Sequence, residues 1–128
     1  MIKVSVTKQS NYPIGASKIK TKLAKFFVSQ GIVSDAEVSV AIVGEKKMMT
    51  LVNLYLKDKK LHNVLSFTPA EAKGFVYPPD NKMHLGEIIV CYPVAIAEAK
   101  KEGVLIDDKV YELIEHGAMH LLGIHHAE

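Results

Sequence analysis

The sequence has 128 residues, of which 48% are hydrophobic, and this length and apolar content predict one globular domain over residues 1–128. The composition excludes a disordered chain, and a formal net charge of +2 is far below that of a protein dedicated to binding nucleic acid. All 16 basic residues are lysines, so anions can be bound by ammonium groups but not by the bidentate guanidinium of arginine.

Cysteine content and hydropathy indicate the cellular compartment. The single cysteine, Cys91, excludes an internal disulfide and suits the reducing cytoplasm. The first residues contain no apolar segment of signal-peptide length, and no run approaches the roughly 18 apolar residues of a membrane-spanning helix. We therefore expect a cytoplasmic protein that has no membrane partner.

The N-terminal half of the sequence predicts two strand–helix pairs. Apolar and polar residues alternate over 2–7, which predicts a strand with one face toward a core. Residues 17–30 place apolar side chains on one helical face and lysines on the other, with Ser17 as the N-cap. A second strand is predicted at 37–43 and a second helix at 45–56.

The C-terminal half predicts two strands followed by two helices. Residues 63–67 form a short strand, and a loop that contains proline and glycine leads to a buried strand at 85–91. A helix is predicted at 93–102, and a last helix, capped by Asp107, runs to about residue 122. The order β-α-β-α-β-β-α-α predicts an α+β fold in which helices pack on a mixed four-stranded sheet.

Histidines at the end of the last helix form a metal-ligand pattern. His116 and His120 are four residues apart and therefore project from the same helical face. Gly123 can adopt a left-handed conformation that ends the helix, so that His126 can arrive as a third ligand. Three histidines and one open position are typical of catalytic zinc, which predicts one Zn²⁺ per chain. The sequence leaves open the role of His125 and does not identify the metal beyond doubt.

The same histidine spacing occurs in metzincin proteases. Their motif, H-E-x-x-H-x-x-G-x-x-H, places a glutamate general base directly after the first histidine. In this chain that position is Gly117, which has no side chain to accept a proton. A metzincin-like protease is therefore the less favoured alternative.

Three blocks of the sequence carry a family resemblance. Residues 116–126, HGAMHLLGIHH, resemble the C-terminal motif H-G-x-L-H-L-x-G-[YF]-D-H of the YbeY family of metal-dependent endoribonucleases. Residues 62–67, HNVLSF, are similar to that family's T-D-V-L-S-F, and residues 85–88, LGEI, to its L-G-D-I. The resemblance implies a mixed α/β fold, zinc on the three motif histidines and single-strand-specific RNA cleavage. It also implies a role in 16S rRNA maturation and ribosome quality control, with the small ribosomal subunit as partner.

Departures from the family pattern fall at candidate catalytic positions. Asn53 and Tyr55 lie near where the family has N-x-x-Y-R. The arginine of that motif falls near Leu56 or Lys57, so only Lys57 can bring positive charge to a phosphate. Asn63 stands where the family has aspartate, and Glu87 replaces the aspartate of L-G-D-I. These differences favour, as an alternative function, a catalytically weakened, zinc-bound factor associated with the ribosome.

Glu87, Ser66 and Lys57 are the candidate catalytic residues. Glu87 is the candidate for moving a proton when metal-activated water attacks an RNA phosphodiester. Ser66 either contacts a phosphate in the cleft or bonds to neighbouring backbone, and His62 either rims the cleft or lies exposed in a loop. A lysine cluster before this block is expected to face RNA: Lys46, Lys47, Lys57, Lys59 and Lys60. The sequence does not reveal the cleavage site, the oligomeric state or protein partners.

Overall fold

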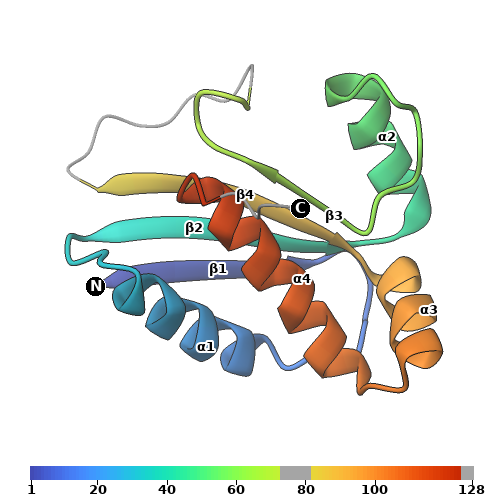
Figure 1. The fold of residues 1–128 in the computed structure, drawn as a ribbon, viewed down its shortest axis with the longest axis horizontal. Coiled ribbons are helices and arrows are strands. Elements are labelled where there is room, and N and C mark those ends of the chain that lie inside the picture. Colours follow the sequence, from blue (N-terminus) through green and yellow to red (C-terminus); the bar gives the residue numbers. More distant parts are fainter. Residues whose placement is uncertain (73–81, 125–128) are drawn as a thin grey trace.

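The computed structural model describes residues 1–72 and 82–124. Within these residues the chain forms strands and helices in the predicted order (Figure 1). The strands are β1 Ile2–Lys8, β2 Ala36–Val43, β3 Val64–Phe67 and β4 Met83–Cys91. The helices are α1 Ala16–Ser29, α2 Glu45–Tyr55, α3 Tyr92–Glu102 and α4 Ile106–Leu121. The predicted α+β fold and element order are therefore confirmed.

The four strands form one mixed sheet with the order β1-β2-β4-β3. β2 pairs in parallel with both β1 and β4, as expected for strands joined through helices. β3 pairs with β4 in the antiparallel direction, and this short strand forms one edge of the sheet. The functional site described below lies beside this edge.

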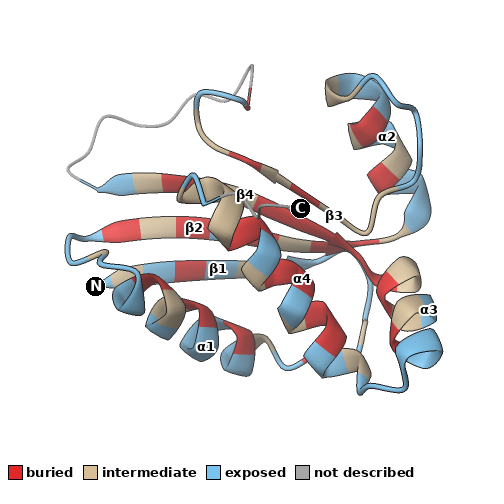
Figure 2. Ribbon diagram, in the orientation of Figure 1, coloured by how far each residue is buried: buried red, intermediate tan, exposed pale blue. Residues whose placement is uncertain are grey.

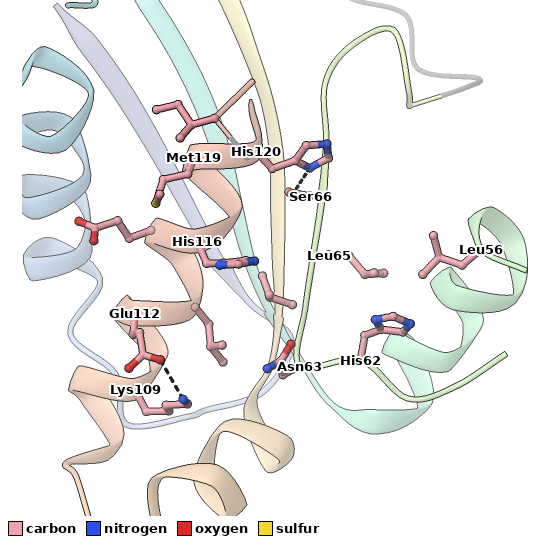
Figure 3. A pocket seen from close by; sticks show the side chains of 14 residues that line it. Leu56, His62, Asn63, Leu65, Ser66, Lys109, Glu112, His116, Met119 and His120 are labelled. Carbon is pink, nitrogen blue, oxygen red and sulfur yellow. Dashed lines mark hydrogen bonds and ion pairs between the residues drawn. The ribbon is translucent and has the colours of Figure 1, made fainter. Parts of the chain in front are cut away.

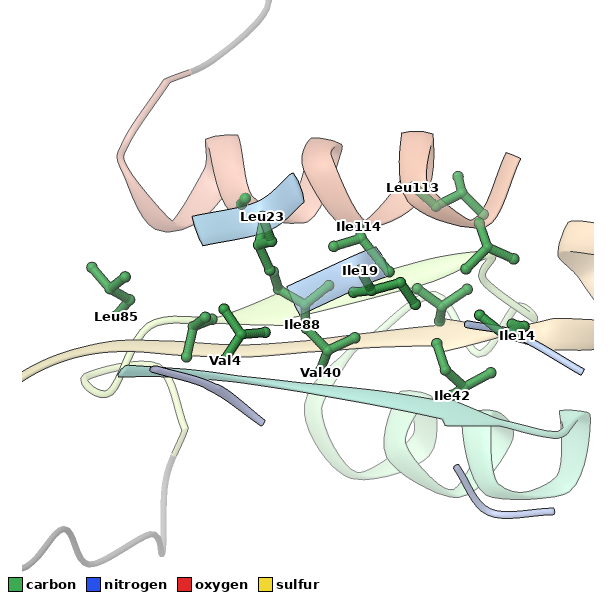
Figure 4. Packing of buried hydrophobic residues seen from close by; sticks show 14 of the residues in the cluster. Val4, Ile14, Ile19, Leu23, Val40, Ile42, Leu85, Ile88, Leu113 and Ile114 are labelled. Atoms are coloured by element: carbon green, nitrogen blue, oxygen red, sulfur yellow. The ribbon is translucent and has the colours of Figure 1, made fainter. Parts of the chain in front are cut away.

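Helices cover the two faces of the sheet unequally. α1 and α4 lie against one face and α2 against the other, and each helix turns its buried side chains toward the strands (Figures 1 and 2). Figure 4 shows Leu23 of α1 and Ile114 of α4 packed with strand residues Val40 and Ile88. In the part of the chain that the structure describes, no helix is long and apolar enough to span a membrane.

Side chains alternate between these two faces from Ile88 to Cys91 of β4. Ile88 and Val90 belong to the core cluster under α1 and α4. Ile89 and Cys91 belong to the smaller cluster under α2. This alternation is the normal pleat of a strand, and it decides which face each polar neighbour meets.

The two predicted helix N-caps are wrong. α1 begins at Ala16 and α4 at Ile106, so Ser17 and Asp107 each lie one residue inside the helix. The carboxylates of Asp107 and Asp108 are in the first turn of α4. Negative charge is favourable there because the helix dipole makes its N-terminus positive, which explains the aspartates without a capping role.

A buried lysine joins α3 to α4. Lys109 is 5% exposed, and its Nζ lies 2.9 Å from the nearer carboxylate oxygens of both Glu102 and Glu112. Glu98 lies 3.7 Å away. The hydrogen bonds that Lys109 donates to Glu102 and then to Glu112 raise the pKa of Lys109, so the lysine keeps its charge in the fold.

Gly86 allows β3 and α4 to approach β4 closely. The register between β2 and β4 shifts just before this residue, which marks a β-bulge, and Gly86 has φ +135°. A Cβ atom at this position would lie 2.2 Å from the carbonyl oxygen of Phe67 and 2.8 Å from Cδ2 of Leu121. Only glycine fits without displacing the backbone of β3.

We expect Gly86→Ala to lower the free energy of unfolding by about 2 kcal/mol or more, because the new Cβ must displace the Phe67 carbonyl. Gly15→Ala is the control, since the nearest atom to a Cβ there is 3.8 Å away and the expected change is within about 1 kcal/mol. Urea denaturation measures both. Equal stability of the two variants would show that the contact of β4 with β3 and α4 tolerates a side chain at residue 86.

Candidate functional site

A cleft of about 850 Å³ lies between α4, the edge strand β3 and the segment that links α2 to β3 (Figure 3). Helix α4 contributes both predicted helical ligands, His116 and His120. The linking segment contributes Leu56, His62 and Asn63, and β3 contributes Val64, Leu65 and Ser66. The cleft therefore combines two blocks of the sequence that are about fifty residues apart.

His116 and His120 both project from α4 into this cleft (Figure 3), as their spacing predicts. Gly117, between them, faces the sheet instead. A Cβ at Gly117 would lie 2.9 Å from Cγ2 of Ile88 and 3.4 Å from Cβ of Ser66. The position that carries the metzincin glutamate therefore has no room for a long side chain, and the glycine brings α4 close to β3 and β4.

The ring of His120 is held between a hydroxyl and a carboxylate. Oγ of Ser66 lies 2.6 Å from Nδ1, and Oε2 of Glu71 lies 3.4 Å from Nε2. A hydroxyl can donate or accept, so Ser66 suits either neutral tautomer of the ring. The sequence favoured a phosphate or the backbone as the partner of Ser66, but the structure shows His120 in that role.

Glu71 is the site residue that the sequence analysis missed. Its Oε1 accepts hydrogen bonds from the backbone N–H of Thr68 at 2.9 Å and from its hydroxyl at 3.1 Å. The Thr68 N–H is the main cause that holds the pKa of Glu71 below its ordinary value, so the carboxylate is ionised at neutral pH. The T-x-x-E spacing of a capping box, directly after β3, was a signal that could have identified it.

The end of α4 turns as predicted. Gly123 has φ +75°, and its backbone N–H donates to the carbonyl of His120 at 2.9 Å. The N–H of Ile124 donates to the carbonyl of Met119 at 2.9 Å. Together these bonds form a Schellman motif, which ends the helix directly after the histidine pair and changes the direction of the chain.

The described donors fit a metal site in part. His116 and His120 offer two imidazoles to one cleft. With Ser66 at Nδ1 of His120, a cation would bind this ring through Nε2, which now lies 3.4 Å from Oε2 of Glu71. The third predicted ligand, His126, and its neighbour His125 lie outside the described residues. Among residues 1–72 and 82–124, no three His, Cys, Asp or Glu side chains are grouped to hold a metal.

The structure separates Glu87 from the histidines. Ile88 meets α4 at Gly117, so Glu87, its neighbour in the pleated strand, points to the opposite face of the sheet. There it lines a separate cavity of about 200 Å³ together with Ser5, Thr7 and Ser39, and burial raises its pKa. The structure therefore separates Glu87 from His116 and His120, and the role of Glu87 in moving a proton stays a prediction.

The remaining predicted residues lie along the far wall of the cleft. Leu56 lines the cleft, and Lys57 is exposed directly after it. Asn63 also lines the cleft, and its Nδ2 donates to both carboxylate oxygens of Glu98, each at 3.2 Å. An aspartate at this position would oppose the carboxylate of Glu98, so a neutral amide suits these surroundings.

Comparisons with known proteins identify the family. The family model described as Endoribonuclease YbeY matches residues 5–128. The endoribonuclease YbeY of Dehalococcoides mccartyi is 30% identical over 118 residues, which cover 86% of this chain and 69% of the relative. That of Geobacter metallireducens is 30% identical over 126 residues, which cover 98% of this chain and 81% of the relative.

A solved structure shows the same fold. The solution structure of TM1509 from Thermotoga maritima matches with a TM-score of 0.57 and 21% sequence identity, covering 97% of this chain and 75% of that chain. The family model, in turn, extends over nearly the whole sequence. The chain therefore belongs to the endoribonuclease YbeY family.

Proposed function

We propose that this protein is a single-domain, zinc-dependent endoribonuclease of the cytoplasm. Its proposed substrate is single-stranded RNA, and its proposed role is in 16S rRNA maturation and ribosome quality control with the small ribosomal subunit as partner. Membership of the endoribonuclease YbeY family supports an RNA-cleaving hydrolase. The observation that carries the proposal is the placement of His116 and His120 in one cleft, with Ser66 bonded to His120.

One zinc ion would be held by His116, His120 and His126. When bound, zinc supplies Lewis-acid activation of water and charge stabilisation for a phosphodiester. Ser66 fixes the orientation of the His120 ring through Nδ1. Glu71, ionised and 3.4 Å from Nε2 of the same ring, is placed to accept a proton from water at its Oε2. Lys57, exposed directly after the cleft residue Leu56, would add positive charge beside the cleft.

His120→Ala should abolish cleavage of a short single-stranded RNA and reduce the zinc content of the purified, untagged protein, because a ligand is lost. His84→Ala is the control. His84 is paired with Glu37 at 2.8 Å but is not among the residues that line the cleft. Cleavage rates and metal analysis measure both variants. Equal RNA cleavage by wild type and His120→Ala would place the activity elsewhere.

The same assays separate the alternative functions. Zinc binding and association with the small subunit, without RNA cleavage by wild type, would favour the catalytically weakened ribosome-associated factor. This alternative is supported by Leu56, an apolar residue that lines the cleft near the position of the family's arginine. Peptide cleavage without RNA cleavage would favour a metzincin-like protease.

Glu71→Gln should lower kcat for RNA cleavage by about a hundredfold or more, because the amide cannot accept a proton. Zinc content should be retained, since the substitution keeps the size of the side chain. Glu87→Gln is the matched control, a change of the same chemistry on the opposite face of the sheet, and should leave kcat near the wild-type value. A loss confined to Glu87→Gln would contradict the role of Glu71.

A further inference from the structure

A second histidine–carboxylate pair lies on the wall of the cleft that faces α4. His62 lines this wall (Figure 3), and its Nε2 lies 2.7 Å from Oδ2 of Asp58. The side chain of His62 is 31% exposed, so the ring is accessible from the cleft. No step of the proposed zinc chemistry uses this pair.

The turn that carries the pair is held by its own hydrogen bonds. Oδ1 of Asp58 accepts from the backbone N–H of Lys60 at 3.0 Å, and Nζ of Lys59 donates to the carbonyl of Asn53 at 3.0 Å. Lys59 has φ +57°, a left-handed conformation that a lysine adopts only where its surroundings hold it. These bonds hold the turn that carries Asp58, and Asp58 in turn contacts the His62 ring.

The contact with Asp58 determines what the ring can offer to a ligand. The backbone N–H of Lys60 is the main cause that keeps the pKa of Asp58 below its ordinary value, so the carboxylate is ionised and only accepts hydrogen bonds. Nε2 of His62 is therefore the donor in this contact. In a neutral ring, Nδ1 then has a free lone pair and is a hydrogen-bond acceptor.

Charge divides the cleft into two regions. The segment before His62 carries three exposed lysines, Lys57, Lys59 and Lys60. The other end, where α3 meets α4, has three carboxylates around one lysine: Glu98, Glu102 and Glu112 around Lys109. These lysines lie on the exposed turn beside the cleft rather than in its lining. A sugar–phosphate backbone is attracted to this lysine-bearing turn and repelled from the acidic end, which would bring its ribose groups near His62.

We propose that His62 is a specificity-determining residue, whose Nδ1 accepts a hydrogen bond from a ribose 2′-hydroxyl of single-stranded RNA bound beside the lysine-bearing turn. The inference rests on the proposed nuclease function, because it takes RNA as the ligand. The 2′-hydroxyl is the donor that distinguishes RNA from DNA, and every nucleotide carries it next to a phosphate. A base edge offers no such regular donor.

The test compares the binding of RNA and DNA of one sequence. Stopped-flow fluorescence anisotropy of the zinc-loaded full chain measures both dissociation constants before cleavage begins, at mildly alkaline pH. Wild type should bind RNA more tightly than DNA. His62→Phe, which keeps the ring but removes the acceptor, should weaken RNA binding by about two- to tenfold and leave DNA binding unchanged.

Two further variants make the test independent of folding defects. Asp58→Asn should also reduce the RNA-to-DNA affinity ratio, because the amide can donate to Nε2 and leave Nδ1 as the N–H donor. His84→Phe removes another carboxylate-paired histidine, one absent from the cleft lining, and should keep the wild-type ratio.

The outcomes separate this proposal from the nuclease proposal. An equal loss of RNA and DNA binding in His62→Phe would show a phosphate or base contact and overturn the 2′-hydroxyl assignment. An unchanged ratio would also overturn it, as would equal binding of RNA and DNA by a wild type that still cleaves RNA. A wild type that neither binds nor cleaves RNA would overturn the nuclease proposal as well.

Discussion

The close approach of α4 to the β3 edge of the sheet is the constraint on which the site depends. Gly117 removes the side chain that would meet Ile88 and Ser66, and Gly86 leaves room for Leu121 on the next turn of the helix. Because α4 lies close to β3 and β4 at Gly117 and Gly86, Oγ of Ser66 comes within 2.6 Å of Nδ1 of His120. A helix displaced outward would keep its two histidines on one face but lose the partner that orients one of them.

Features set by local periodicity could be predicted from the sequence. Helical spacing placed His116 and His120 on one face, and Gly123 marked the end of their helix. Alternating and continuous apolar runs identified all four strands, and the element order indicated a mixed sheet. Residues 62–66 of the block HNVLSF, which is similar to a family motif, line the same cleft as His116 and His120.

Features that depend on contacts between distant segments could not be predicted from the sequence. Glu87 was assigned to the site because its neighbours matched a motif, but its face depends on the pleat of β4 and on the bulge at Gly86. The partner of Ser66 is 54 residues away in sequence, a separation over which no periodicity acts. Glu71 was missed because its position relative to His120 is fixed by a turn through Thr68, outside any regular element.

The buried Lys109 has a consequence for alkaline conditions. Hydrogen bonds to Glu102 and Glu112 raise its pKa above the ordinary value of 10.5, so the ammonium form is favoured by folding. The stabilisation is fully present below that ordinary value and is lost only as the pH rises through the higher pKa of the folded state. Lys109 therefore keeps its charge across the physiological pH range. It holds α3 against α4 at one end of the cleft without acting as a proton sensor.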